Sequence, residues 1–248
     1  MILGSDEDLR FTECFREIDE AVHQMTYASG KIVVFNGHRF AGPPGAIVYS
    51  LENLHAHPEW RVPSFRGQIW DYNKANFSEY PEDANVTYVP VGYHSSMHRF
   101  HRSNRLDIDL IFCGALNERR QTVLDKIRQQ GFKVEVLHFN QWGIARDRKL
   151  GRARLALNIH YYDKPSSANG CGLFESVRVS HLVANSVPVV TENSYDNEEQ
   201  DGWGLESCSY AELTDVVVRK LQGSQEELAK QAAHCLERFR QKPMILPL

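Results

Sequence analysis

The stretch that decides the fold reads Phe112-Cys113-Gly114-Ala115-Leu116-Asn117-Glu118-Arg119-Arg120. It closes an apolar run over 107–113 that is typical of a buried strand, and Gly114 ends that strand. Asn117 predicts the N-cap of a helix that continues to Gly131. The free N–H groups of such a helix start and the forked side chains of the two arginines suit phosphate oxygens. The stretch therefore predicts a strand, a turn and a helix that together bind a diphosphate.

Strand and helix patterns alternate along the rest of the chain, which is typical of an α/β protein. Strands are predicted over 31–35, 46–50, 68–71, 86–90, 132–139, 155–160 and 187–190, and helices over 8–25, 141–152 and 174–185. Two capping boxes, Ser209 with Glu212 and Ser224 with Glu227, predict the starts of the final helices. Short apolar strands favour parallel sheets that are covered on both faces.

The same pattern, with a polar stretch in its middle, predicts two α/β domains, of which the second is doubly wound. We assign 1–95 to a reduced N-terminal domain, the polar His- and Arg-rich stretch 96–106 to a linker, and 107–248 to a C-terminal domain. The last helix is free in this scheme to pack back on the N-terminal domain. The 248 residues are enough for two small domains of this kind.

Composition indicates an ordinary globular protein, with 42% apolar and 24% charged residues. The sequence has no apolar stretch long enough for a membrane span and no basic and apolar leader at its start, so we predict a cytoplasmic protein without a membrane span. Its five cysteines are an odd number without a C-x-x-C pair, which favours reduced thiols.

Charge is distributed unevenly along the chain. The formal net charge is -4, yet residues 99–154 carry 13 Lys and Arg against 6 Asp and Glu. Because the total is negative and no basic run is interleaved with aromatic residues, the sequence argues against extended nucleic-acid binding. The basic middle of the chain predicts a small phosphorylated ligand instead.

Polar residues at other predicted strand and helix ends extend the candidate site. Asn158, His160 and Tyr161 lie at the end of the strand 155–160. Glu175 follows a glycine-rich loop at the start of the next helix, where it either complements the helix dipole or accepts hydrogen bonds from the hydroxyls of a ribose. Arg178, one turn later, is an ion-pair partner or a second phosphate contact. The absence of a P-loop and of G-x-G-x-x-G disfavours an ATPase and a hydride-transfer enzyme.

The order of these motifs over residues 86–195 resembles the C-terminal half of GT-B glycosyltransferases, most closely a bacterial and viral branch related to spore-maturation glycosyltransferases. The resemblance implies two Rossmann-like domains that face a central cleft, with a nucleotide-sugar donor held mainly by the C-terminal one. It also implies transfer to a hydroxyl of a glycan, a lipid-linked sugar or a protein, as in polysaccharide biosynthesis. No cofactor and no obligatory metal are implied.

The roles that the resemblance implies, together with Asn117 and Arg178 from the patterns above, give a predicted donor site of nine residues. Gly114 and Arg119 or Arg120 would meet the diphosphate, and Glu175 the ribose. The remaining members are Asn117, Asn158, His160, Tyr161 and Arg178, of which Asn158, His160 and Tyr161 would lie near the base or the sugar.

One departure from the family bears on the chemistry. Many retaining members carry a second Glu eight residues after the first, and this chain has Val183 there, which slightly favours an inverting reaction. An inverting reaction needs a general base, which we expect in the N-terminal half. His38 is the first candidate, followed by Glu52 and Asp71.

Alternatives remain at this stage. The fold is also compatible with a non-catalytic module that binds a nucleotide or a carbohydrate. The sequence is also compatible with assembly into a homo-oligomer. An epimerase or hydrolase is less favoured because a second nucleotide fingerprint is missing. The histidines His94, His98 and His101 have a spacing that some zinc sites use, but without an acidic ligand nearby we interpret them as polar surface.

Overall fold

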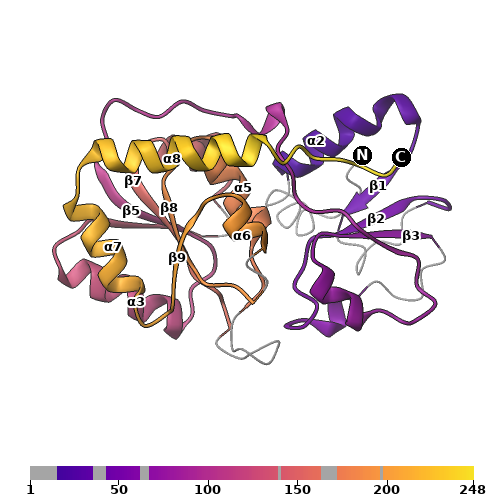
Figure 1. Ribbon diagram of the computed structural model, residues 1–248, viewed down its shortest axis with the longest axis horizontal. Coiled ribbons are helices and arrows are strands. Elements are labelled where there is room, and N and C mark those ends of the chain that lie inside the picture. The colour runs from indigo at the N-terminus through magenta and orange to yellow at the C-terminus, as the bar shows by residue number, and fades with distance from the viewer. Residues whose placement is uncertain (1–15, 36–42, 62–66, 139–140, 163–171, 196–197) are drawn as a thin grey trace. The chain divides into compact units, whose positions relative to one another are not determined.

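The computed structural model describes residues 16–35, 43–61, 67–138, 141–162, 172–195 and 198–248. The chain divides into two compact units (Figure 1). Unit 1 consists of Met1–Ser96 together with Pro243–Leu248, and unit 2 of Met97–Lys242. Each unit holds one sheet of parallel strands, which confirms the predicted α/β fold with two sheets.

Unit 1 is built on a four-stranded sheet in the order β1-β2-β3-β4. Its elements are α2 (Arg16–Thr26), β1 (Val33–Phe35), β2 (Ile47–Ser50), β3 (Gln68–Asp71) and β4 (Val86–Tyr88), with 3-10 helices at Tyr27–Ser29, Pro58–Trp60, Lys74–Glu79 and Ser95–Met97. All four strands lie where the apolar runs predicted them. Tyr49 and Trp70 are fully buried, and the Tyr49 hydroxyl donates to the Val89 carbonyl at 2.7 Å.

Residues from the far end of the chain complete unit 1. Tyr93 pairs with Pro243 in a parallel bridge, and the Met244 N–H donates to the Tyr93 carbonyl at 2.9 Å. A Cβ on Gly92 would lie 2.4 Å from the Met244 nitrogen, so only glycine allows the two backbones to approach this closely. The sequence assigned residues 243–248 to the C-terminal domain, whereas the backbone pairing places them in unit 1.

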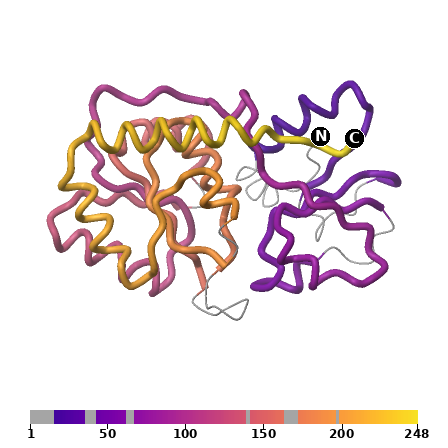
Figure 2. The backbone as a smooth tube through the Cα atoms, viewed as in Figure 1, coloured from indigo at the N-terminus to yellow at the C-terminus, as the bar shows by residue number. Residues whose placement is uncertain are grey.

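Unit 2 has a five-stranded sheet in the order β6-β5-β7-β8-β9 (Figure 2). Its elements are β5 (Ile108–Cys113), α3 (Glu118–Gln129), β6 (Val134–Leu137), α4 (Gly143–Leu150), β7 (Ala153–Asn158), α5 (Ser176–Ala184), β8 (Val189–Glu192), α6 (Glu198–Gly202), β9 (Glu206–Cys208), α7 (Leu213–Gln222) and α8 (Gln225–Arg240). Because β6 and β7 flank β5 on opposite sides, the strand order reverses between β5 and β7, which is where ligands bind in such sheets.

Helices cover both faces of the unit 2 sheet. In Figure 1 the sheet runs between α8 on one side and the pair α3 and α7 on the other, and α5 packs with α8. The core against α3 and α7 takes Leu155, Leu157 and Ile159 from β7 and the residue after it. Since side chains alternate along a strand, Asn158 lies on the face that carries α5.

The helix starts of unit 2 agree only in part with the sequence prediction. The capping box of Ser224 and Glu227 is present at the start of α8. At Ser209 the Glu212 carboxylate accepts from the Ser209 N–H and hydroxyl, but α7 begins four residues later, at Leu213. A short turn after β9 occupies the residues between them.

Residues 97–100, which we expected in the linker, are bonded to the end of α5. The Asn185 side chain, 1% exposed, accepts from Arg99 N at 2.7 Å and from Phe100 N at 3.0 Å, and it donates to the Met97 carbonyl at 2.9 Å. These three bonds hold the start of unit 2 against its own helix layer.

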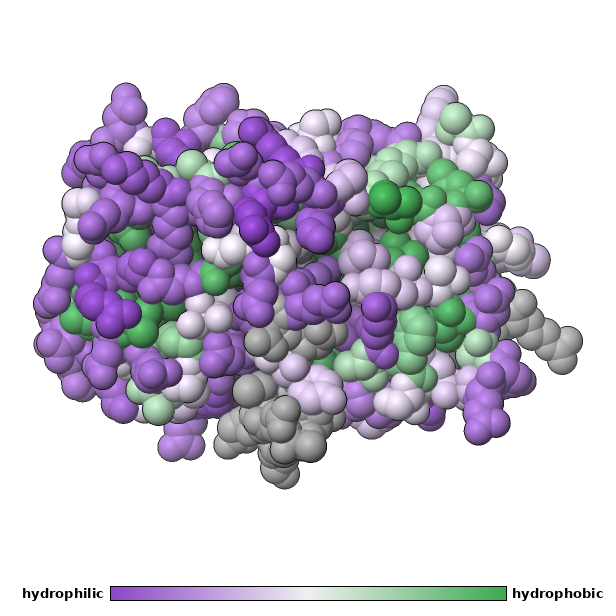
Figure 3. Space-filling model, viewed as in Figure 1, coloured by the Kyte–Doolittle hydropathy of each residue, from purple (hydrophilic) through white to green (hydrophobic). Residues whose placement is uncertain are grey.

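Hydrophilic side chains cover most of the visible face of unit 2 (Figure 3). The helix α8 explains part of this surface, because it buries Leu228, Ala232, Cys235 and Phe239 at helical spacing and turns the remaining residues outward. Among the described residues we find no helix with the length and apolar content that a bilayer span requires.

Candidate functional site

The turn after β5 brings two arginines together. Gly114 has φ +142°, a conformation that favours glycine, and a Cβ there would lie 3.5 Å from atoms of both Arg120 and Arg178. Asn117 caps α3 as predicted, since its Oδ1 accepts from Arg120 N at 3.0 Å. The strand end, the glycine turn and the helix start therefore form the unit that residues 112–120 indicated.

Arg120 lies beneath this turn and is 1% exposed. Its Nε and Nη2 donate to the Ile159 carbonyl at 3.0 and 2.6 Å, and its Nη1 donates to the Ala115 carbonyl at 2.9 Å. Nη2 also lies 3.2 Å from Glu175 Oε1. Burial, together with the nearby Arg178, lowers the pKa of Arg120 to about 10. The sequence predicted that Arg120 or its neighbour contacts a diphosphate directly, but all three guanidinium nitrogens of Arg120 already donate hydrogen bonds within the protein.

Glu175 and Arg178 form the more open part of the same cluster. They pair across the start of α5, and each side chain is 24% exposed. Arg178 Nη1 also donates to Asn158 Oδ1 at 3.1 Å, and Asn158 in turn donates to the Thr191 hydroxyl at 3.0 Å. Although burial raises the pKa of Glu175, Arg178 and Arg120 outweigh it and hold that pKa below its usual value.

We call the group formed by Gly114, Arg120, Asn158, Glu175 and Arg178 the Arg178 cluster. It lies at the ends of β5 and β7, where the strand order reverses, and at the N-terminus of α5. Arg178 is the guanidinium of this cluster that is open to solvent. A helix N-terminus, a glycine turn and an accessible arginine are the groups that bind a phosphate.

The side chain of Arg119 points in a different direction from that of Arg120. It forms a two-pronged ion pair with Glu192 at the end of β8 and donates to the His160 carbonyl at 3.0 Å. Its guanidinium carbon lies 3.8 Å from the centre of the Tyr210 ring, and the Tyr210 hydroxyl donates to the Arg119 carbonyl at 2.9 Å. The charge of Arg119 is therefore already neutralised by a carboxylate.

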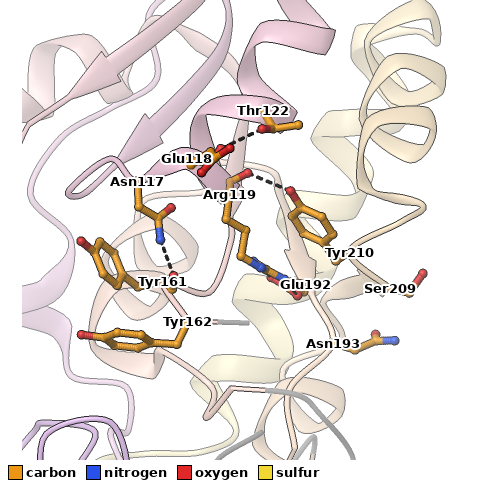
Figure 4. A pocket seen from close by; sticks show the side chains of 10 residues that line it. All are labelled: Asn117, Glu118, Arg119, Thr122, Tyr161, Tyr162, Glu192, Asn193, Ser209 and Tyr210. Carbon is orange, nitrogen blue, oxygen red and sulfur yellow. Dashed lines mark hydrogen bonds and ion pairs between the residues drawn. The ribbon is translucent and has the colours of Figure 1, made fainter. Parts of the chain in front are cut away.

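A pocket of about 770 Å³ opens beside this ion pair (Figure 4). We call it the α3–α7 pocket because its wall comes from the first turns of α3, the ends of β7 and β8, and the turn before α7. It is lined by Asn117, Glu118, Arg119, Thr122, Tyr161, Tyr162, Glu192, Asn193, Ser209 and Tyr210. Three of the predicted donor residues, Asn117, Arg119 and Tyr161, thus line this pocket, and the Tyr161 ring centre also lies 5.1 Å from the guanidinium carbon of Arg120.

His160 is buried close to both the Arg178 cluster and the α3–α7 pocket. It is 3% exposed, and its Nε2 lies 3.1 Å from the Asn193 carbonyl. A Cβ on Gly172 would lie 2.7 Å from the imidazole, so the contact between residue 172 and the ring requires a glycine. Burial lowers the pKa of His160 and keeps the ring neutral. Its backbone N–H donates to Glu192 at 3.0 Å, which positions the carboxylate for Arg119.

The structure also contains polar partners that the sequence reasoning missed. Glu192 follows a predicted strand end, so the rule that selected Asn158 applies to it equally. A second missed group, Asp147 with His181 and Arg146, is buried between α4 and α5, where Asp147 Oδ1 lies 3.0 Å from His181 Nε2. This group fastens two helices and is closed to solvent.

The three candidate bases fall in unit 1. His38 lies outside the described residues, and Glu52 is half-buried in the turn after β2. Asp71 ends β3 and is fully buried. Its carboxylate accepts from Asn73 N at 2.9 Å, from Asn76 Nδ2 at 2.9 Å and from the Tyr80 hydroxyl at 2.7 Å. In this position Asp71 joins β3 to the loop that follows, and its side chain is closed to solvent.

Asp71 predicts a pH dependence of stability. Burial raises its pKa to about 7, against the lowering effect of its hydrogen bonds to Asn73, Tyr80 and Asn76. Between about pH 4 and pH 7 the folded protein then keeps a proton that the unfolded chain has lost, so stability falls as pH rises. We expect this group to contribute a slope of at most about 1.4 kcal/mol per pH unit to the free energy of unfolding.

The comparison with Asp71→Asn isolates that contribution. The variant lacks the titrating group, so its free energy of unfolding in urea should fall less steeply than that of the wild type between about pH 4 and pH 7. Equal slopes for the two proteins over this window would contradict the expectation.

The histidine-rich stretch does not form a metal centre. Across the part of the chain that the structure describes, no group of three or more His, Cys, Asp and Glu side chains is placed to hold a metal ion. His98 and His101 contact each other edge to face with ring centres 5.1 Å apart, and His94 Nδ1 lies 2.8 Å from the Ser96 hydroxyl.

Two solved structures are similar to this chain over most of its length. One is WaaG, a glycosyltransferase involved in lipopolysaccharide biosynthesis, with a TM-score of 0.54 and 11% identity, covering 87% of this chain and 76% of that one. The other is AviGT4, a glycosyltransferase involved in avilamycin A biosynthesis, with a TM-score of 0.50 and 15% identity, covering 92% and 86%. At these identities the likeness shows the fold, which is that of GT-B glycosyltransferases.

Relatives in sequence come from Acanthamoeba polyphaga mimivirus. The uncharacterized proteins L137 and L138 are 29% and 26% identical to this chain over 131 and 144 residues, which is 51% and 55% of this chain but only 17% and 16% of those proteins. The uncharacterized protein L140 is 24% identical over 160 residues, which is 62% of this chain and 50% of its own length. The chain therefore spans no more than half of these relatives. No family model matches it.

Proposed function

We propose that the chain is a glycosyltransferase that moves a sugar from a nucleoside diphosphate sugar to an acceptor hydroxyl. The observation that carries this proposal is the Arg178 cluster. It combines an accessible guanidinium, an ionised carboxylate and a helix N-terminus at the reversal of strand order in a GT-B fold.

The cluster suggests a division of roles. Arg178 makes forked hydrogen bonds to the diphosphate and stabilises the negative charge that grows on it as the sugar leaves. Glu175 accepts hydrogen bonds from the ribose hydroxyls. Arg120 holds the Glu175 carboxylate in place from below, at 3.2 Å. In this arrangement a guanidinium and a helix dipole supply the positive charge, so the reaction needs no obligatory metal.

The proposed stereochemistry is inversion, and it rests on the helix that begins just after Glu175. Val183, eight residues later, is 1% exposed, so α5 offers no second carboxylate at that position. This supports an inverting reaction, in which a base removes the acceptor proton. With Asp71 fully buried, Glu52 and His38 remain the candidates for that base. The acceptor classes named above and the relation to spore-maturation glycosyltransferases stay predictions.

Nucleotide titration tests the proposal. UDP, GDP and dTDP are added separately to the folded protein in buffer with a chelator, and heat of binding is measured by calorimetry. We expect at least one of the three to bind without a divalent metal. If none binds, with or without magnesium, while thermal unfolding shows a folded protein, the proposal fails.

A second candidate function is a binding module without turnover. The burial of Asp71 favours it, because one of the three expected bases is closed to an acceptor. Incubation with the labelled sugar form of the nucleotide that binds distinguishes the two functions. A transferase releases nucleoside diphosphate, by transfer or by slow hydrolysis of the donor, whereas a module leaves the donor intact.

A further inference from the structure

The α3–α7 pocket adjoins the Arg178 cluster, since the ring centre of Tyr161 in its wall lies 5.1 Å from the guanidinium carbon of Arg120. No residue that lines it belongs to that cluster, because Arg119 and Arg120 leave α3 toward different carbonyls, those of His160 and Ile159. Its volume of about 770 Å³ lies within the range of ligand sites, which is about 300 to 1,000 Å³. The glycosyltransferase proposal gives this pocket no role.

The charges of the pocket disfavour an anion. Among its lining residues the cationic side chain is Arg119, and both of its terminal nitrogens are bonded to Glu192, one of them also to the His160 carbonyl. Glu118 adds a second carboxylate on the exposed surface of α3. The lining therefore carries a formal charge of one negative unit. A phosphate would have to compete with Glu192 for Arg119, which leaves it the start of α3 and the uncharged groups of the lining as partners.

The remaining lining offers an aromatic ring on one side and polar groups on the other, which suit the C–H groups and the hydroxyls of a sugar. Tyr161 and Tyr162 contact each other edge to face with ring centres 4.8 Å apart, and Tyr162 is 38% exposed. An aromatic ring held in this way offers a flat apolar face to the C–H groups of a pyranose. Asn193 and Ser209 stand on the opposite side of the opening (Figure 4). Carboxylate, amide and hydroxyl groups at such an edge both accept and donate hydrogen bonds, as sugar hydroxyls require.

From this combination we infer that the α3–α7 pocket binds a neutral glycosyl unit at a site distinct from the nucleotide site. The ring of the sugar packs on Tyr162, and its hydroxyls bond to Glu118, Glu192 and the polar groups opposite. Because the site uses no residue of the Arg178 cluster, saccharide binding does not require a bound nucleotide.

Saturation-transfer NMR with a panel of neutral saccharides tests the inference. The panel holds the methyl glycosides of glucose, galactose, mannose, rhamnose, fucose and N-acetylglucosamine, together with maltose and lactose, and pyrophosphate serves as the anionic competitor. We expect at least one saccharide to receive saturation from the protein and pyrophosphate to leave that signal unchanged. No signal across the panel, or displacement by pyrophosphate, overturns the inference.

Variants then locate the binding. Tyr162→Ala should weaken binding of that saccharide about tenfold or more, while Tyr162→Phe keeps the ring and should keep the affinity. Thr122→Trp, at an exposed position of α3, fills the pocket and should abolish the signal. Tyr195→Ala is the matched control, because Tyr195 is 41% exposed in the same unit and does not line the pocket.

The outcomes of the variants are separable from the nucleotide titration. Wild-type affinity in both Tyr162→Ala and Thr122→Trp places the saccharide elsewhere and overturns the inference. Loss of saccharide binding in these folded variants, with nucleotide binding unchanged, supports it. If no nucleotide binds the wild type but a saccharide does, the glycosyltransferase proposal fails, whereas the inference of a saccharide site is supported.

Discussion

Arg178→Ala lowers the affinity for the nucleoside diphosphate that binds the wild type by about 10- to 100-fold, the loss expected for forked, charge-assisted hydrogen bonds. Arg178 is the accessible guanidinium of its cluster, and its side chain is 24% exposed. In the variant Glu175 keeps its partner Arg120, so the turn around Gly114 remains supported. Calorimetric titration of the variant against the wild type measures the change.

Three further variants make this result specific. Arg178→Lys keeps the positive charge but loses the forked pair of donors, and its affinity should lie between those of the wild type and Arg178→Ala. Arg128→Ala removes an exposed arginine that pairs with Asp125 near the other end of α3, so it controls for net charge and should bind like the wild type. Arg119→Ala should retain most of the affinity, since its side chain faces the α3–α7 pocket. Equal affinity in Arg178→Ala and Arg128→Ala would remove Arg178 from the site.

Arg120→Met destabilises the protein by about 3 to 5 kcal/mol, because it removes a buried guanidinium that donates to two carbonyls and to Glu175. The methionine has a similar length but no donor, so the carbonyls of Ile159 and Ala115 and one oxygen of Glu175 lose their partner. Urea-induced unfolding of wild type and variant gives the difference.

A double variant identifies the cause of that loss. Arg120 and Glu175 are bonded to each other, so removing one side chain lowers the cost of removing the other. Arg120→Met combined with Glu175→Gln should therefore be more stable than the sum of the two single effects predicts. Arg128→Met is the matched control and should change stability by less than about 0.5 kcal/mol, because its ion pair is exposed. A loss below about 1 kcal/mol in Arg120→Met would show that its buried bonds contribute little.

The main-chain course of the site was predictable from local sequence. Gly114 and Asn117 mark a strand end and a helix cap through their own backbone and side-chain chemistry, and neither depends on distant residues. The strands of both sheets were predictable for a similar reason, since continuous apolar runs indicate burial on both faces. In contrast β9, with three residues, and α6, with five, are too short for a periodic pattern.

The directions of the two adjacent arginines could not be predicted. Consecutive residues of a helix point about 100° apart, and which one meets the ligand depends on the strands that flank them. Glu192 comes from a strand 73 residues away and captures Arg119, whereas the carbonyl of Ile159 captures Arg120. The sequence pattern identified the basic turn, but the residues that contact Arg119 and Arg120 in the folded protein decide where each side chain points.

The pairing of Tyr93 with Pro243 determines the order in which the chain can be completed during synthesis. The two partners are far apart in sequence, and all of unit 2 lies between them. A ribosome therefore exposes every residue of unit 2 before it releases the last segment of unit 1. Unit 2 can fold once its own residues have been synthesised, whereas the parallel bridge of unit 1 can form only after residues 243–248 have followed.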